Sequence, residues 1–126
     1  IIQLHGRENI EEYTYLNKDI IKTIHVSEDL LNQVSKLDFD NINYLLDATD
    51  IDCKGGTGNT FDWKILKDIP VEKLFIAGGL KPDNIRDLLD KYTPKCVDVS
   101  SGIEKKISFK DHKLMIDFVD RIRKYK

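Results

Sequence analysis

The stretch IAGGLKPDN, residues 76–84, ends a short apolar run in two glycines and then begins a helical pattern. Glycine lets the backbone approach a ligand closely, and the N–H groups at the start of a helix attract anions. Proline is well suited to the first turn of a helix, as at Pro82. We therefore predict a strand that ends at Ala77, a helix that starts near Pro82, and a phosphate bound at the turn between them.

The same strand-then-helix pattern occurs five times in the 126 residues. Short runs that are mostly apolar on both faces, as in a buried parallel sheet, occupy Ile1–His5, Ile20–Val26, Ile42–Ala48, Lys73–Ala77 and Cys96–Val99. Helical patterns follow at residues 8–17, 28–37, 63–69, 82–92 and 111–123, with Ser27 and Asp62 expected as N-caps. Since no connection has hairpin character, we predict one α/β domain over residues 1–126, built from five βα units.

Two architectures fit five βα units. A flavodoxin-like open sheet suits the chain length, whereas part of a (βα)8 barrel suits the residues at the strand ends. In both architectures the ligand binds where the parallel strands end. The residues at these ends that suggest chemistry are His5, Asp47, Gly78, Gly79, Asp98, Ser100, Ser101 and Gly102.

Composition narrows the choice of ligand. The net charge is -2 and charged residues make up 33% of the chain, with both signs interspersed. This pattern argues against a nucleic-acid or membrane surface, and no apolar run approaches the roughly 20 residues of a membrane span. Cys53 and Cys96 form neither a metal motif nor a redox motif, and two unpaired thiols predict a cytoplasmic protein.

Two consecutive strand ends carry phosphate-type features. Gly78 and Gly79 follow one strand, and Ser100, Ser101 and Gly102 follow the next. In barrels, the loops after the last two strands often form a phosphate site. A tight strand-to-helix connection would explain either turn alone, but the repetition together with serine hydroxyls favours a phosphate.

Asp47 ends the apolar run YLLD. Burial disfavours the ionised form of a carboxyl group, which suits such a residue to acid catalysis, although a loop-bracing aspartate fits this stretch equally well. His5, at a strand end, could equally be a structural histidine, and Asp98 could brace neighbouring loops by hydrogen bonds. The glycine-rich loop with Gly55 and Gly56 is interpreted either as a lid or as a surface loop.

Taken in order, QLHG (3–6), LLDAT (45–49), KGGTGNTFDW (54–63), IAGGLKPDNI (76–85) and VDVSSGIE (97–104) resemble the phosphoribosylanthranilate isomerase family of tryptophan biosynthesis. The resemblance covers essentially the whole chain and implies a (βα)8 barrel, of which these residues form the C-terminal portion from about the fourth strand. It implies that Asp47 is the general acid and that the phosphate is bound around Gly78, Gly79, Ser100, Ser101 and Gly102. It also implies that Gly55 and Gly56 border the substrate and that His5 and Asp98 support the site.

The family reaction is an Amadori rearrangement of N-(5-phosphoribosyl)anthranilate to 1-(2-carboxyphenylamino)-1-deoxyribulose 5-phosphate, without a cofactor or metal. The resemblance places the general base, a cysteine, and an arginine that contacts the anthranilate carboxylate in βα units absent from this sequence. We therefore expect these 126 residues alone to be inactive and to associate through exposed sheet edges.

Two alternatives stay open at this point. A flavodoxin-like phosphate-binding or receiver module would need an acidic pair after its first strand to hold Mg²⁺, and IIQLHG has none. Another phosphate-binding barrel enzyme, such as indole-glycerol-phosphate synthase, would need catalytic lysine and glutamate residues at several strand ends.

Overall fold

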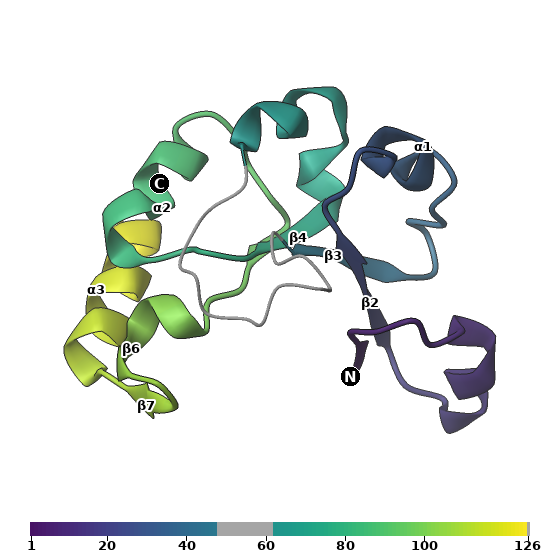
Figure 1. Cartoon of the computed structure of the whole chain (residues 1–126), viewed down its shortest axis with the longest axis horizontal. Coiled ribbons are helices and arrows are strands. Elements are labelled where there is room, and N and C mark those ends of the chain that lie inside the picture. Colours follow the sequence, from purple (N-terminus) through teal and green to yellow (C-terminus); the bar gives the residue numbers. More distant parts are fainter. Residues whose placement is uncertain (48–61, 126) are drawn as a thin grey trace.

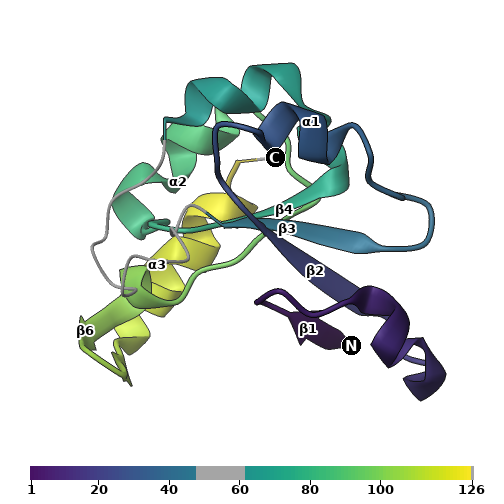
Figure 2. The same ribbon diagram turned by 45° about the vertical axis from the view of Figure 1, so that its right-hand side comes forward.

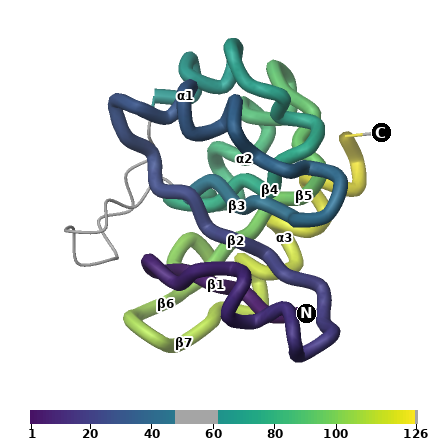
Figure 3. The backbone as a smooth tube through the Cα atoms, turned by 90° about the vertical axis from the view of Figure 1, so that its right-hand side faces the viewer, coloured from purple at the N-terminus to yellow at the C-terminus, as the bar shows by residue number. Residues whose placement is uncertain are grey.

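The computed structural model describes residues 1–47 and 62–125, and its centre is a sheet of five parallel strands (Figures 1 and 3). The strands are β1 (Ile2–Leu4), β2 (Ile20–His25), β3 (Asn43–Asp47), β4 (Leu74–Ala77) and β5 (Cys96–Val97). All five predicted strands are confirmed, each within the predicted bounds.

The strands lie side by side in chain order, β1-β2-β3-β4-β5. A flavodoxin-like sheet would instead place its first strand between the second and the third. Sequential order is the order of a (βα)8 barrel, in which each strand pairs with the next one along the chain. The flavodoxin-like and receiver alternative is therefore wrong, and the fold is of the TIM-barrel type.

The described residues form three α-helices, α1 (Leu30–Val34), α2 (Pro82–Leu89) and α3 (His112–Arg123). They follow one another in an arc along one side of the sheet, and α2 packs beside α3 (Figures 1 and 2). Pro82 is the first residue of α2, as predicted. Within the described residues, no helix is both long and apolar enough to cross a membrane.

Two of the predicted helical segments form 3₁₀ helices instead of α-helices. The segment 8–17 contains η1 (Ile10–Leu16), which buries no residue and stops at Asn17, where φ is 52°. The segment 63–69 contains η2 (Trp63–Asp68), and a third short helix, η3 (Val71–Lys73), follows it. A proline at position 70 forces the preceding residue, Ile69, into an extended conformation, which ends η2 early.

One of the two predicted N-caps is correct. The Asp62 carboxylate accepts a hydrogen bond of 3.0 Å from the Lys64 backbone N–H at the start of η2. Ser27, by contrast, does not cap α1, whose N-cap position is Asp29. The Ser27 hydroxyl instead accepts a hydrogen bond from the Gln33 side chain, one turn into the helix.

The sheet has apolar residues on both faces, as predicted for buried strands. The face toward the helices carries the main core, which includes Ile24, Leu46 and Ile76. The opposite face carries a small cluster of Ile21, Leu45 and Ala77, with Phe75 packed against it. Because side chains alternate along a strand, Asp47 lies on the same face as Leu45, the smaller of the two apolar surfaces.

The expectation that no hairpin occurs is wrong. After β5 the chain forms η4 (Ser101–Ile103) and then an antiparallel pair, β6 (Glu104–Lys106) and β7 (Phe109–Lys110). Only two residues, Ile107 and Ser108, connect these strands, and Ser108 has a φ of 66°. The turn lacks the Asn-Gly or Asp-Gly pair that usually identifies a hairpin, so the sequence did not indicate one here.

Candidate active site

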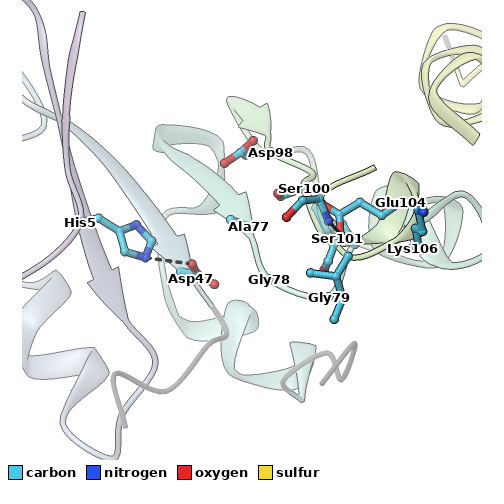
Figure 4. Close-up of a pocket in the computed structure, with 13 residues that line it drawn as sticks. His5, Asp47, Ala77, Gly78, Gly79, Asp98, Ser100, Ser101, Glu104 and Lys106 are labelled. Atoms are coloured by element: carbon cyan, nitrogen blue, oxygen red, sulfur yellow. Dashed lines mark hydrogen bonds and ion pairs between the residues drawn. The ribbon is translucent and has the colours of Figure 1, made fainter. Parts of the chain in front are cut away.

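A pocket of about 600 Å³ opens where the parallel strands end (Figure 4). It is bounded by the ends of β3, β4 and β5 and by the β6–β7 hairpin. The described residues that line it are His5, Asp47, Ala77, Gly78, Gly79, Leu80, Asp98, Ser100, Ser101, Glu104, Lys106, Ile107 and Ser108. Seven of the predicted site residues therefore come together in one pocket.

The other three predicted residues, Gly55, Gly56 and Gly102, are not among the described residues that line it. Gly55 and Gly56 lie outside the described residues, as does Cys53. Gly102 is described but lies against the backbone of Leu80 instead of facing the pocket. Cys96 is exposed at the start of β5, at the end of the strand away from the pocket.

Asp47 is the last residue of β3 and is held between two neighbouring strands. In the sheet register it pairs with His25 on β2 and with Ala77 on β4. Only 8% of the residue is exposed, although its side chain borders the pocket. On the pocket side it contacts His5, whose Nε2 atom lies 3.6 Å from Oδ2 of Asp47. A nearly buried carboxyl group at a pocket wall can deliver a proton to a bound molecule.

His5 is oriented by two residues of β2. Its Nδ1 atom lies 3.2 Å from the hydroxyl of Thr23, which is itself buried. Its backbone carbonyl accepts a hydrogen bond of 3.0 Å from Nε2 of His25, and the two imidazole rings pack edge to face. Since these contacts fix both the backbone and the ring of His5, its Nε2 atom is directed toward Asp47.

The turn after β4 adopts the conformation that its glycines permit. Gly78 and Gly79 have φ values of 87° and 66°, in the left-handed region that other residues rarely adopt. The Asn84 side chain holds the turn, because its Nδ2 donates to the Gly79 carbonyl and its Oδ1 accepts from the Lys81 backbone N–H. Asn84 was not among the predicted site residues, since the sequence shows it only as a residue in the first turn of a helix.

The turn after β5 is held by Lys110 of the hairpin. The Lys110 ammonium group donates to the carbonyl and to the hydroxyl oxygen of Ser100, at 2.8 and 3.1 Å. It also donates to Oε1 of Glu104 at 2.7 Å. A hydroxyl that accepts a hydrogen bond can still donate one, so Ser100 can donate to a ligand, and Ser101 adds a second hydroxyl at the pocket wall.

Asp98 is positioned through its backbone. Its N–H donates to the carbonyl of Ile76 at 2.8 Å, which extends the pairing of β4 and β5 by one residue. The side chain then lies at the pocket wall beyond the end of β5 (Figure 4). This position is compatible with a contact to a polar group of a bound ligand.

Charge is unevenly distributed around the pocket. His5 and Asp47 lie at one end, whereas Glu104 and Lys106 lie at the other, with the glycine turn between them (Figure 4). The hydrogen bond from Lys110 lowers the pKa of Glu104 below its ordinary value of 4.5. Glu104 is therefore ionised near neutral pH and has its charge balanced by Lys110.

The chemistry available in this pocket is proton transfer and anion binding. The described residues contain no group of three or more His, Cys, Asp and Glu side chains that could hold a metal ion. A nearly buried carboxyl group at one end, together with hydroxyl groups beside a glycine turn, suits a ligand that carries a phosphate at one end.

Comparisons of the sequence and of the structure with known proteins all find the same family. The family model described as N-(5'phosphoribosyl)anthranilate (PRA) isomerase matches residues 1–121. The N-(5'-phosphoribosyl)anthranilate isomerase of Listeria innocua is 40% identical over 107 residues, which are 82% of this chain and 52% of the relative. The chain spans about half to three fifths of the length of the curated relatives it matches.

Solved structures of phosphoribosyl anthranilate isomerases also superpose on this chain. The crystal structure of phosphoribosyl anthranilate isomerase from Thermotoga maritima superposes with a TM-score of 0.76 and 32% identity, over 97% of this chain and 60% of that one. A phosphoribosyl anthranilate isomerase crystallised with reduced 1-(o-carboxyphenylamino)-1-deoxyribulose 5-phosphate gives a TM-score of 0.71 and 30% identity, over 97% and 58%.

Proposed function

Since this chain belongs to the N-(5'-phosphoribosyl)anthranilate isomerase family, we propose that it contributes the general acid and the phosphate-binding turns of that reaction. The substrate is N-(5-phosphoribosyl)anthranilate and the product is 1-(2-carboxyphenylamino)-1-deoxyribulose 5-phosphate, an intermediate of tryptophan biosynthesis. One observation carries the proposal: Asp47 and the two turns after β4 and β5 line the same pocket.

The ribose phosphate binds at the two turns. Gly78 and Gly79 have positive φ and carry no side chain of their own, so their backbone can approach the phosphate closely. Ser100 and Ser101 supply hydroxyl groups, and Gly102 lets the second turn pack against the first. Gly55 and Gly56 are proposed to border the substrate, as the family resemblance implies.

Asp47 acts as the general acid. It donates its proton to the furanose ring oxygen while the bond from that oxygen to the anomeric carbon breaks, which leaves a Schiff base. His5, fixed by Thr23 and His25, limits the orientations of the Asp47 carboxyl group. Asp98 contacts a polar group of the substrate between the two ends of the pocket.

The second step needs a base, which removes the proton from C2′ and leaves an enol that tautomerises to the ketone. We assign this role to none of the residues in this sequence. The proposal assigns the five βα units to the C-terminal portion of a (βα)8 barrel, so the base and the anthranilate-binding arginine come from the earlier units. No cofactor is proposed, and the proposed location is the cytoplasm.

Association through the sheet edges also stays a proposal. In the described part of the chain, β1 and β5 each pair with one neighbouring strand, and Ile116 and Val119 on α3 are exposed. Unpaired edges and exposed apolar side chains both favour contact with further strands or with another copy. Sedimentation analysis of the 126-residue polypeptide across a concentration series tests this, and a monomer at every concentration would contradict it.

The function is tested by binding and turnover together. Reduced 1-(o-carboxyphenylamino)-1-deoxyribulose 5-phosphate is titrated into the protein to measure binding. Turnover of N-(5-phosphoribosyl)anthranilate is followed by the loss of its fluorescence in the protein that contains this sequence. We expect saturable binding and turnover, and the absence of both would overturn the proposed function.

A further inference from the structure

Lys106 is the one lysine or arginine among the described residues that line the pocket. It is the last residue of β6, so it lies on the hairpin and not at the end of a parallel strand. The other ionisable lining residues are His5, Asp47, Asp98 and Glu104. A phosphate ester carries one to two negative charges near neutral pH, so an anion entering this pocket meets carboxylates unless a cation is placed among them.

The Lys106 side chain is held in place by an aromatic ring. Lys106 pairs with Phe109 across the hairpin, and its Nζ atom lies 4.2 Å from the centroid of the Phe109 ring. A cation above an aromatic face at this distance is attracted by the ring but keeps its hydrogen-bond donors available. No carboxylate among the described residues lies within ion-pair distance of Lys106, so its charge is available to a ligand.

The neighbouring lysines have other roles. Lys110 donates hydrogen bonds to the carbonyl and hydroxyl oxygens of Ser100 and to the carboxylate of Glu104. Lys105 does not line the pocket; it lies near Asp111 at the start of α3, whose pKa is lowered mainly by the backbone hydrogen bonds from Lys113 and Leu114 and in smaller part by the charge of Lys105. The pairing of β6 with β7 is irregular between Glu104 and Lys106, and in this arrangement Glu104 and Lys106 border the pocket whereas Lys105 does not.

We propose that Lys106 binds the phosphate group of the substrate and thereby orients it, with the phosphate toward the hairpin and the sugar ring toward Asp47. This inference rests on the proposed function of the same pocket. The hairpin brings a positive charge to the end opposite Asp47, while the glycine turn lies between the two (Figure 4). A reversed substrate would place its phosphate at the end of the pocket that carries His5 and Asp47, away from the positive charge of Lys106.

The experiment compares Lys106→Met with Lys105→Met. Both variants remove one positive charge from the same strand, but only the first removes it from the pocket. Inorganic phosphate and ribose 5-phosphate are titrated into each protein by calorimetry at low ionic strength, with circular dichroism to verify folding. We expect about fivefold weaker binding of both probes to Lys106→Met, as for a partly exposed charged contact, and little change for Lys105→Met. Lys106→Arg, which keeps the charge, is expected to bind within about twofold of the wild type.

The possible outcomes distinguish the role of Lys106 from the proposed phosphate site. Unchanged affinity in Lys106→Met, or an equal loss in both methionine variants, would overturn the role of Lys106 while the phosphate site itself stands. A wild-type protein that binds neither probe would overturn the phosphate site and the proposed function with it. Should Lys106→Met fail to fold, Lys106→Gln replaces it in the same comparison with Lys105→Gln.

Discussion

The backbone of Gly102 lies directly against the carbonyl group of Leu80, so a Cβ atom on residue 102 would collide with it. The carbonyl carbon of Leu80 would lie only 2.8 Å from that atom, and the Lys81 Cα 3.0 Å from it. The turn after β5 therefore packs onto the turn after β4 through bare backbone. This contact joins the two halves of the proposed phosphate site.

Gly102→Ala is expected to destabilise the fold by about 1–3 kcal/mol, because neither backbone segment can move without displacing the other. It should also weaken phosphate binding, since the two turns separate. Chemical denaturation and a phosphate titration measure the two effects. Gly6→Ala is the matched control, because its Cβ would meet only the flexible carboxylate end of Glu8. Equal effects in the two variants would contradict the packing argument.

The pair formed by Glu104 and Lys110 predicts a stability that depends on pH. Hydrogen bonding from Lys110 lowers the pKa of Glu104 below 4.5 in the folded state. The pair therefore stabilises the fold above about pH 4.5, and this contribution is lost as the pH falls through the lowered pKa.

Glu104→Gln should thus be less stable than the wild type above pH 4.5, with a difference that shrinks at lower pH. Thermal denaturation from pH 7 to pH 3 measures it, with Glu72→Gln as a control that removes an exposed carboxylate elsewhere. A difference that stays constant with pH would show that the ion pair does not contribute in this way.

The hairpin turn contains a conformational strain that glycine would relieve. Ser108 adopts a φ of 66°, where an L-residue with a side chain is disfavoured. Ser108→Gly is expected to raise the free energy of unfolding by up to about 1 kcal/mol, since glycine tolerates this conformation at the cost of some chain entropy. Ser35→Gly, at a residue with a φ of -64°, should lower it instead. If both variants lose stability, the strain at Ser108 is negligible.

Much of the fold was predictable because strands and helices have different periodicities. Short apolar runs predicted all five strands, and the rule that parallel strands share one carboxyl edge brought His5, Asp47 and Gly78 to the same place. The order of the strands, however, depends on how the units pack. The sequence alone therefore left the flavodoxin-like alternative open, and the direct pairing of β2 with β3 excludes it.

The hairpin and its lysines were not predictable from local patterns. Ile107 and Ser108 carry none of the usual turn residues, so β6 and β7 resembled a plain connection. Lys106 and Lys110 looked like ordinary surface lysines, because their roles arise only when the hairpin folds back beside Ser100. Likewise, the short η1 and η2 have helical spacing but lack the buried contacts and the uninterrupted length that an α-helix needs.

The most direct test of the central claim is the turnover of N-(5-phosphoribosyl)anthranilate by Asp47→Asn in the protein that contains this sequence. The change keeps the size of the side chain and removes the acidic proton. Turnover is predicted to fall on the order of 100-fold to 10,000-fold, while the reduced product analogue still binds. Asp87→Asn, on the exposed face of α2, should turn over as the wild type does. Wild-type turnover in Asp47→Asn would contradict the assignment of Asp47 as the general acid.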